Sequence, residues 1–416
     1  MSKYVEFADA EGILTDMFLP GFRSQIEKEK PPLFSVLSAK SDKVAGKNVI
    51  FSALMENPQG VGARGSASAV LPTAVAGSAK RVTTGLKRLY AVLEFDDMTL
   101  KAAGTAGGRN EFINHTEQEM AGIKTSFLDD KSRQAYGSGN GALSACGVTG
   151  ASLTLQLSTT AQMQRFVEGM HIDLITTVTG VAIANGSDRT IQSVDVDNKR
   201  VVLDTAGGVV TTDSTISAAR QGAWGSEVTG LSAIVSATAD IYDITTASYR
   251  RWKSYVATGV GAFSTKKLAQ AMLESKIRGG KFANLIVCSP LRQLQYWYEL
   301  TGTRTFDVAK SPIPVQKYGT GYYGLEITIE GKKAIMLGDI ECLDSEIYGL
   351  NTEDIGIQHF GEAEWIKQDG SVLIPNIGGA NGTATYKAVM AYYWEIICTR
   401  RNSHFKMEGV TDSSGW

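Results

Sequence analysis

The feature that most constrains the fold is a stretch of small, uncharged residues, 65–79, between two segments that read as β-strands. Both segments, NVIFSALM before the stretch and RLYAVLEF after it, place apolar residues at every second position, which is the period of a half-buried strand. Paired as a hairpin, they would hold residues 65–79 at its distal end. Such a two-stranded ribbon is marginally stable alone in water, so it needs a surface to lie on. The apolar faces are Val49, Phe51 and Met55 in the first segment and Leu89, Ala91, Leu93 and Phe95 in the second.

From Asn110 onward the apolar period changes from two residues to three or four. The segment NEFINHTEQEMAGIKTSFLDDKSRQAYG is typical of an amphipathic helix that stops at Gly137. Asn110 is the predicted N-cap, and Glu111 suits the first turn, where unpaired amides and the helix dipole favour a carboxylate. Such a helix is about 40 Å long, which is unusual for a globular helix with one apolar stripe. The stripe holds Phe112, Ile113, Thr116, Met120, Ile123 and Phe127.

The segments on either side of these elements differ in character. Residues 1–45 are interrupted by Pro20-Gly21, Pro31-Pro32 and the charged EKEK. These breaks predict an arm that lies extended or partly helical on other surfaces and contributes little core of its own. Residues 150–217 hold short strand-like runs separated by Gly, Asn and Asp, which predicts a small β-rich insertion.

A compact α/β segment is predicted after the insertion. Its first helix begins after Ser264 as N-cap and stops at Gly279, and its second starts at Pro290, capped by Ser289. The apolar strand FANLIVCS lies between the two helices. The last part of the chain is β-rich, with a hairpin predicted at residues 330–331 and a long strand or strand pair in TATYKAVMAYYWEIICTRR.

Length, charge and cysteines bound the class of protein. The 416 residues predict two or three domains. With 41 basic and 43 acidic residues the net charge is −2, which gives no sign of a protein that binds nucleic acid electrostatically as a whole. The four cysteines are far apart and form no C-x-x-C pair, which predicts free thiols in a reducing cytoplasm. The first residues lack the apolar core of a signal peptide, and the longest uncharged run, 134–164, is too rich in Gly, Ser and Thr to span a membrane, so a cytosolic location is predicted.

The sequence contains no motif with catalytic or ligand-binding chemistry. It has no G-x-x-x-x-G-K-[ST] loop, no G-x-S-x-G elbow and no H-x-x-x-H pair among its four histidines. DVDN at 195–198 resembles the start of a calcium loop but lacks the later ligands, so Asn198 is predicted to lie in a hairpin turn and to take its left-handed position. YWY at 296–298 favours core or interface over base stacking. We predict no enzyme activity, no cofactor and no metal.

In their order, the arm, ribbon, long helix, β-rich and α/β body and closing strand resemble the major capsid proteins of tailed bacteriophages, the Hong Kong ninety-seven type. Two local phrases add to the resemblance. SEVTGLSAIV with YDITTASYRRWKSY, residues 226–255, is similar to the passage by which these proteins enter their axial domain. GDIECLDSEIYGLNTEDIGIQHFGE, residues 338–362, is similar to the strand pair that returns to the peripheral domain. The resemblance covers nearly the whole chain and implies an α+β phage major-capsid fold.

The resemblance implies a function and six parts. The function is self-assembly of hexamers and pentamers into an icosahedral shell, in the host bacterial cytoplasm, around double-stranded DNA that is enclosed without sequence-specific binding. The near-neutral charge suits such a container, because a basic lining would hold the packaged polyanion. The parts are the N-arm 1–45, the E-loop ribbon 46–104, the peripheral domain with its spine helix 105–149, the β-rich insertion 150–217, the axial domain 218–335 and the return to the peripheral sheet 336–416.

Partners and contact residues follow from the same resemblance. A portal protein is expected, and the insertion is a candidate site for a decoration protein. Only about 45 residues precede the ribbon, so a separate scaffolding protein is expected instead of a cleaved internal one. The distal stretch has no lysine before Lys80, so the covalent crosslink of one branch of the family is not expected. The E-loop tip is expected to meet a neighbouring copy through Arg64, Leu71, Val75, Lys80 and Arg81.

Three alternatives stay open. An encapsulin-like nanocompartment has the same fold but stores an enzyme, and it would need a docking groove for a cargo peptide. A secreted β-rich adhesin or a phage tail component is favoured by the Thr/Val-rich middle and disfavoured by the long helix. An enzyme with dispersed active-site residues lacks any motif with catalytic mechanics.

Overall fold

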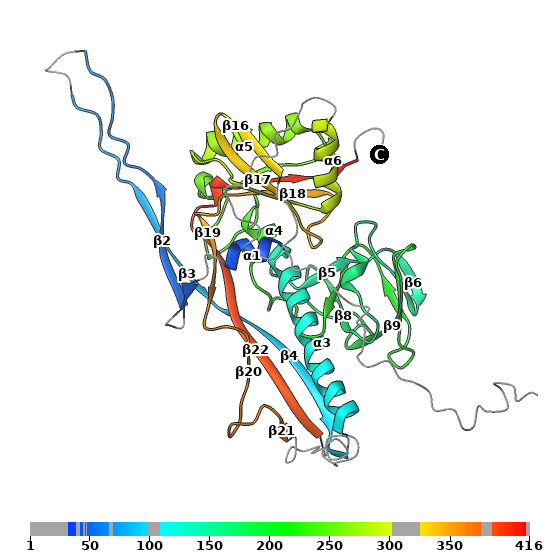
Figure 1. Cartoon of the computed structure of the whole chain (residues 1–416). Coiled ribbons are helices and arrows are strands. Elements are labelled where there is room, and N and C mark those ends of the chain that lie inside the picture. Colours follow the sequence, from blue (N-terminus) through cyan, green and yellow to red (C-terminus); the bar gives the residue numbers. More distant parts are fainter. Residues whose placement is uncertain are drawn as a thin grey trace, which may run out of the picture. The chain divides into compact units, whose positions relative to one another are not determined.

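In the described residues, the computed structural model contains three six-stranded sheets with helices beside them (Figure 1). We name them the spine sheet, the insertion sheet and the α/β sheet. Within the described part of the chain, no helix is both long and apolar enough to cross a membrane. The described residues are 32–38, 42–44, 46, 48–65, 70–98, 109–301, 325–375 and 385–412.

The spine sheet is built around β22, Thr385–Cys398, which is the predicted long closing strand. β4, Lys87–Asp96, is the predicted strand RLYAVLEF and pairs antiparallel with β22 along its whole length. Alternate residues of β4 are more buried, as the two-residue period predicts, and Ala91 is in the core. The other strands of this sheet are β1 (Asp42–Lys43), β19 (Ile355–His359), β20 (Glu364–Trp365) and β21 (Ile374–Pro375).

The predicted long helix is α3, Arg109–Tyr136, and it packs along β4 (Figure 1). It begins one residue before Asn110, so Asn110 is not its N-cap, and it ends just before Gly137 as predicted. Phe127 is buried in the same core as Ala91 of β4. The side chains of the first ten residues, 109–118, lie outside the described part.

One lysine of α3 contacts aromatic rings of the sheet and of the N-terminal segment. Lys131 Nζ lies 4.2 Å from the ring centroid of Phe34 and 4.1 Å from that of Tyr392 in β22. Removal of the ammonium from water lowers the pKa of Lys131 to about 8. The lysine of α3 therefore makes cation–π contacts with β22 and with the helix that carries Phe34.

The ribbon differs from the predicted hairpin. β2, Asn48–Glu56, pairs with β3, Ser78–Gly85, and not with the segment RLYAVLEF, which is β4 of the spine sheet. The predicted pairing was wrong because β3 holds a single large apolar residue, Val82, and shows little period of two. β4 instead forms a ladder on β22 and buries its apolar face beneath α3. The chain between the two paired strands is therefore 57–77.

The segment before the ribbon contributes more core than an arm would. α1, Pro32–Ser38, begins at a proline, whose fixed φ suits the first helical position. Leu33 and Leu37 are each 1% exposed and belong to the core that α3 and the spine sheet share, so the expectation of little core is wrong for this segment. β1 then pairs in parallel with β19. The rest of the predicted arm, residues 1–31, lies outside the described part.

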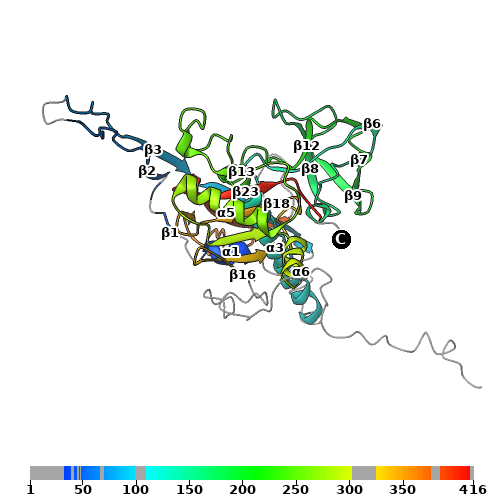
Figure 2. The ribbon, with the colours of Figure 1, turned by 90° about the horizontal axis from the view of Figure 1, so that it is seen from above.

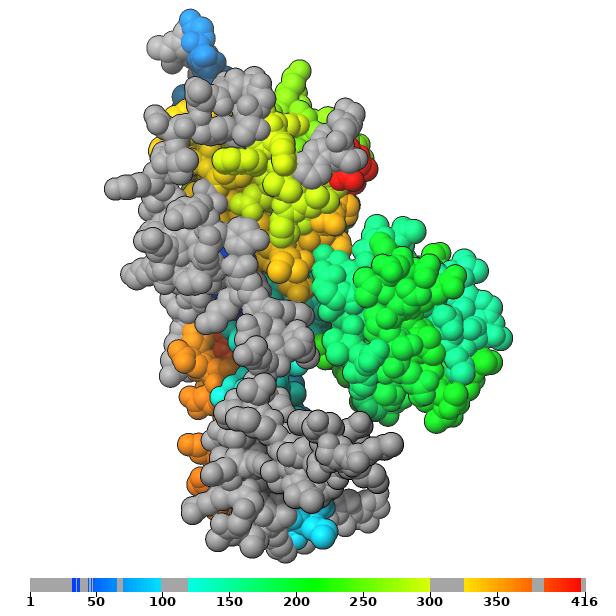
Figure 3. Space-filling view, turned by 45° about the vertical axis from the view of Figure 1, so that its right-hand side comes forward, coloured from blue at the N-terminus to red at the C-terminus, as the bar shows by residue number. Residues whose placement is uncertain are grey.

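The insertion sheet has a hydrophobic core of its own, which includes Leu155, Ile172 and Val201. Its strands run from residue 142 to residue 220, beyond the predicted limits of 150 and 217. Figure 3 shows its side chains gathered in one rounded mass. In spatial order the strands are β5 (Ala142–Ala145), β12 (Ile216–Arg220), β8 (His171–Thr176), β9 (Arg189–Asp195), β10 (Arg200–Leu203) and β7 (Thr154–Gln156), with β6 (Thr149–Ser152) and β11 (Val210–Thr212) as a separate pair.

The turn between β9 and β10 corrects one detail of the sequence analysis. Asn198 lies in this turn, as predicted, but the left-handed residue is Lys199, with φ of 52°. Asn198 instead donates from its backbone amide and its side chain to Asp195, at 3.1 and 2.8 Å. The side chain therefore closes the turn through its hydrogen bonds, and the next residue adopts the unusual backbone.

Ion pairs attach the insertion to the rest of the chain. Arg220 Nε lies 2.8 Å from Asp130 of α3, and Asp130 also pairs with Arg133 at 3.0 Å. At a second place, in the short helix η2 (Met163–Arg165), Arg165 donates to the carbonyl of Glu341 at 3.0 Å, and its guanidinium lies 3.5 Å from the Glu341 carboxylate. The insertion is therefore held at two separate points.

The α/β sheet mixes parallel and antiparallel pairs. Its fully buried strand β15, Leu285–Cys288, is the predicted FANLIVCS and lies between a parallel and an antiparallel neighbour. The predicted hairpin is present, with Glu330 and Gly331 left-handed at φ of 48° and 72°. The other strands are β13 (Tyr255–Ala257), β23 (Phe405–Glu408), β18 (Glu346–Leu350), β17 (Lys332–Gly338) and β16 (Leu325–Ile329).

Two helices flank this sheet where the capping residues predict them. α5, Thr265–Gly279, begins after Ser264, whose Oγ accepts a backbone amide at 3.3 Å, and the left-handed residue that ends it is Gly280, one later than predicted. α6, Pro290–Thr301, is capped by Ser289. α5 packs on β13 and β23 (Figure 2), and α6 packs on β17. The remaining short elements are α4 (Leu231–Ile234), η3 (Arg250–Trp252), η5 (Arg401–Ser403), β14 (Gly261–Ala262) and β24 (Val410–Thr411).

Candidate assembly interface

The ribbon of β2 and β3 is anchored at its base. On its inner face Met55 and Val82 are buried in the core, and the ring of Phe51 meets Tyr242 edge-on, with centroids 6.1 Å apart. The opposite face carries exposed apolar residues, among them Ile50 and Leu54. One face of the ribbon thus lies on its own chain, and the other does not. The sequence analysis expects a supporting surface but does not place it in the same chain.

The tip of the ribbon, residues 57–77, exposes most of its apolar side chains to water. Leu71 is 79% exposed and Val75 is 51% exposed. Val61 and Val70 on the two sides of the tip are 95% and 87% exposed. Residues 66–69 of the predicted tip lie outside the described part. Exposed apolar side chains that gather on one projection are a common feature of interaction surfaces, so the tip is a candidate interface.

The tip keeps its shape through a few hydrogen bonds across it. Gln59 N donates to the carbonyl of Val75 at 3.0 Å. Arg64 Nε donates to the carbonyl of Val70 at 2.5 Å, so this side chain, predicted to face a neighbouring copy, also closes its own loop. At Gly77 a Cβ would lie 2.8 Å from the carbonyl oxygen of Glu56, so the close approach of the two sides requires glycine there.

The other two predicted cations, Lys80 and Arg81, lie on opposite faces of β3. Lys80 Nζ is 5.6 Å from the ring centroid of Tyr249 in the same chain, and Arg81 is exposed. η3 adds two exposed cations that the sequence analysis did not single out, Arg250 and Arg251. They stand in the quoted phrase YDITTASYRRWKSY, and their adjacent pair of charges was the signal that could have found them. The base of the ribbon therefore carries a group of positive charges.

A hollow of 640 Å³ opens beside the ribbon base and holds a buried carboxyl group. Glu395 of β22 is 1% exposed and accepts a hydrogen bond from the Thr229 amide at 2.7 Å. Burial raises the pKa of Glu395 to about 7. Asp240 and Asp243 line the same hollow and are exposed. No sequence motif marks this group, because its members come from two distant segments.

A separate buried pair, Cys398 and His404, has the residue types of a nucleophilic dyad. Sγ and Nε2 are 3.3 Å apart, and both side chains are fully buried. Burial raises the pKa of Cys398 to about 12 and lowers that of His404 to about 4. A nucleophilic dyad needs the reverse, a thiolate beside an imidazolium, so this pair stays neutral and supplies no nucleophile.

The other cysteines, histidines and aromatic residues considered in the sequence analysis do not form a site among the described residues. All four cysteines are buried as free thiols. Among the described residues no group of three or more His, Cys, Asp and Glu could hold a metal ion. Of the YWY segment in α6, Tyr296 is buried, and Trp297 and Tyr298 are 40% and 58% exposed. The side chain of His115 lies outside the described part.

The arrangement of the long helix on the β4–β22 pair, the ribbon and the α/β sheet with α5 and α6 is similar to capsid proteins of known structure. Among solved structures, the cyanophage A-1(L) capsid asymmetric unit is 12% identical, with 96% of this chain and 98% of that one covered and a TM-score of 0.57. The capsid of an empty GTA particle is 7% identical, with 98% and 99% covered and a TM-score of 0.50. No family model matches the sequence, and no curated protein matches it significantly. The predicted resemblance is therefore confirmed for the fold.

Proposed function

We propose that this chain is the major capsid protein of a tailed bacteriophage, which self-assembles into the icosahedral shell around the double-stranded DNA genome. The observation that carries the proposal is the fold likeness to the cyanophage A-1(L) capsid asymmetric unit over 96% of the chain. The exposed apolar tip of the ribbon supports it independently, because a shell protein must leave part of its buried surface to be completed by other copies.

In this proposal the β2–β3 ribbon is the E-loop, and its tip lies on a neighbouring copy. Leu71 and Val75 become buried there, and full burial of such a side chain contributes about 1.5–3 kcal/mol. Arg81, Arg250 and Arg251 at the base pair with acidic residues of the neighbour. Lys80 and Arg64 also face the neighbour, although each already contacts a group of its own chain. The contact repeats in every copy of a hexamer or pentamer. A small binding free energy for each copy is therefore sufficient to close the shell.

The domain limits follow the same proposal. The N-arm comprises 1–45, the E-loop 46–104, the peripheral domain 105–149, the insertion 150–217, the axial domain 218–335 and the returning segment 336–416. β4 joins the spine sheet although it falls within 46–104, and the strands of the insertion extend from 142 to 220.

The proposed partners are a separate scaffolding protein, a portal protein and the packaged DNA, with the insertion as the surface for any decoration protein. The net charge of −2 supports enclosure of DNA without strong binding, because phosphate contacts dominate protein affinity for DNA. Assembly would take place in the cytoplasm of the bacterial host, and the finished protein would be part of the virion.

Electron microscopy of the expressed chain, alone and with its scaffolding protein, tests the proposal. Isometric shells built of hexamers and pentamers are expected. A chain that stays monomeric under both conditions would overturn it. Nuclease-protected DNA in particles from infected cells separates a genome shell from a compartment that stores protein.

A matched pair of variants tests the role of the tip in those shells. Leu71→Asp with Val75→Asp is expected to abolish shells and to leave the circular dichroism and melting of the monomer unchanged. Val178→Asp with Val196→Asp places the same charges at exposed sites of the insertion and should leave the shells intact. Unfolding of the monomer by the tip substitutions would instead assign the tip to the core of its own chain.

A further inference from the structure

Two short links join the α/β sheet to the spine sheet. Residues 351–354 connect β18 to β19, and residues 399–404 connect β22 to β23. The links run next to each other, because β18 pairs with β23 in one sheet and β19 pairs with β22 in the other. Any change in the angle between these two sheets must therefore pass through both links.

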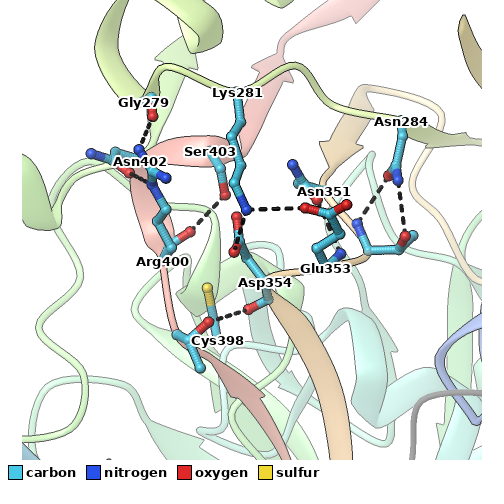
Figure 4. Close-up of polar contacts among 12 residues, drawn as sticks. Gly279, Lys281, Asn284, Asn351, Glu353, Asp354, Cys398, Arg400, Asn402 and Ser403 are labelled. Carbon is cyan, nitrogen blue, oxygen red and sulfur yellow. Dashed lines mark hydrogen bonds and ion pairs between the residues drawn. The ribbon is translucent and has the colours of Figure 1, made fainter. Parts of the chain in front are cut away.

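Direct hydrogen bonds tie one link to the other. The carbonyl of Asp354 accepts from the backbone amide of Thr399 at 2.9 Å and from its hydroxyl at 3.2 Å. Lys281, just after α5, reaches Glu353 and Asp354 at 3.1 Å each (Figure 4). The bonds shown in Figure 4 also attach Arg400 to the last residue of α5.

His404 makes the innermost tie, and it is 0% exposed. Its Nδ1 lies 3.0 Å from the backbone nitrogen of Asn351 in the other link. Because an amide N–H can only donate, Nδ1 must be the acceptor, and the ring proton is on Nε2. Nε2 in turn points at Cys398 Sγ, 3.3 Å away at the end of β22. The neutral ring thus uses both nitrogens to hold the two links together.

A second proton would break this arrangement. It would occupy Nδ1, where it would face the Asn351 amide proton, so the hydrogen bond between the links would be lost and two donors would repel each other. Arg401 from η5 and Lys281 from the α5 side also oppose a positive ring. The Asp354 carboxylate has the opposite influence, and the Cys398 thiol is neutral. Burial dominates these effects and lowers the pKa of His404 to about 4.

We propose that His404 is an acid-sensitive latch between the two links: the neutral ring holds residues 351–354 against residues 399–404, and protonation releases them. The latch belongs to a single chain and does not depend on the proposed shell. A released histidine regains an ordinary pKa near 6.5, so the open state binds the proton more readily than the latched state. The equilibrium for opening then rises about tenfold for each pH unit between roughly 6.5 and 4, and no further below that range.

Hydrogen exchange in the full-length wild-type chain measures this opening directly. The amide of Asn351, once corrected for the intrinsic pH dependence of exchange, should lose protection about tenfold per unit as the pH falls from 6.5 to about 4. The amide of Leu174, in the core of the insertion sheet, serves as the internal reference and should not follow it. Constant protection of Asn351 across this range would overturn the proposal.

Two variants separate the latch from general acid denaturation. His404→Gln keeps a side-chain acceptor but cannot take up a proton, so the pH dependence of exchange at residue 351 should disappear. His171→Gln removes an exposed histidine, which lies 2.6 Å from Asp188 in the insertion, and should leave that dependence intact. The proposal is wrong if His404→Gln opens with the same pH profile as wild type.

A measurement on the wild type decides the question if His404→Gln does not fold. Magnetic resonance of chains labelled at the histidine rings gives the titration of each imidazole. One ring is expected to stay neutral until the pH approaches 4 and to titrate together with the loss of Asn351 protection. Titration of all histidines near pH 6.5 with Asn351 still protected would contradict the latch.

Discussion

The ribbon tip and the junction of the two sheets differ in how much of their surface the chain itself buries. At the tip, Leu71 and Val75 are largely in water, and a few hydrogen bonds across the loop keep its shape. At the junction, His404 and Arg401 are both 0% exposed. The ring of His404 uses both nitrogens for hydrogen bonds, and the Arg401 guanidinium donates to backbone carbonyls. The junction is complete within one chain, whereas in the proposed function a neighbouring copy covers the tip. Substitutions at the junction should therefore change the stability of the single chain, and substitutions at the tip should change only its association.

The largest effect is expected from Arg401→Met. The guanidinium donates to five backbone carbonyls between residues 233 and 252, at 2.9–3.2 Å. Removing it leaves those buried acceptors without a donor and should lower the free energy of unfolding by about 4 kcal/mol. Urea unfolding of the purified chain measures the loss. Arg251→Met, at an exposed site of η3, is the control and should stay within about 0.5 kcal/mol of wild type; equal losses would erase the contrast.

A smaller, pH-dependent effect is expected from Glu395→Gln. Burial raises the pKa of Glu395 from 4.5 to about 7, so the folded chain binds this proton more tightly than the unfolded chain. Its contribution to stability therefore falls as the pH rises from about 4.5 to 7. Glutamine still accepts from the Thr229 amide and cannot ionise, so at pH 8 the variant should be more stable than wild type by up to about 3 kcal/mol, with little difference at pH 4.5.

The variant must be compared with wild type, because titration of His404 changes the free energy of unfolding with pH in the opposite direction to Glu395. Its folded-state pKa lies below 6.5, so it lowers stability as the pH falls from 6.5 to about 4 and partly cancels the effect of Glu395. Unfolding of both chains from pH 4.5 to 8 gives the difference curve. A difference that does not depend on pH would show that Glu395 is ionised alike in the folded and unfolded chains.

The smallest effect is expected at the tip, from Leu71→Ala. The side chain is already in water in the single chain, so its truncation should change the free energy of unfolding by less than about 0.5 kcal/mol. The same change at Leu37 in α1, which is 1% exposed, should cost about 3 kcal/mol because it opens a cavity in the core. Thermal melting of the two variants compares them. Similar losses at both sites would mean that the tip is packed within its own chain.

The sequence predicted those elements whose signals are local. The two-residue period located β2 and β4, the longer period located α3, and the capping serines located α5 and α6. Strand pairing is not a local property, and β3 has only Val82 to mark it, so the partner of β2 was assigned wrongly. The arm was expected to be extended or partly helical, which α1 agrees with, but the bounds and buried leucines of α1 were not predicted. Pro31-Pro32 was taken as a break, although a proline suits the first position of a helix.

The candidate site was predictable in part for the same reason. A run of small uncharged residues between two strands is visible in the sequence, and it marked the tip and its residues Leu71 and Val75. The bond from Arg64 to Val70 and the contact of Lys80 with Tyr249 depend on how the ribbon folds back on its chain. The latch contains Asn351, Cys398 and His404. The pairing of β18 with β23 brings Asn351 next to His404, and strand pairing cannot be read from a local sequence pattern.

The way the chain enters and leaves the insertion sheet has a consequence for its evolution. The first and last strands, β5 and β12, are antiparallel neighbours, with Ala145 opposite Ser217. Just outside them Gly141, left-handed at φ of 84°, lies so close to Ala223 that a Cβ would be 2.6 Å from its carbonyl oxygen. A unit with its own core and adjoining ends is a cassette: a recombination event could remove, lengthen or replace it and rejoin the chain across a short gap. Such an exchange would leave the pairing of β2 with β3 and the ladders of the other two sheets unchanged.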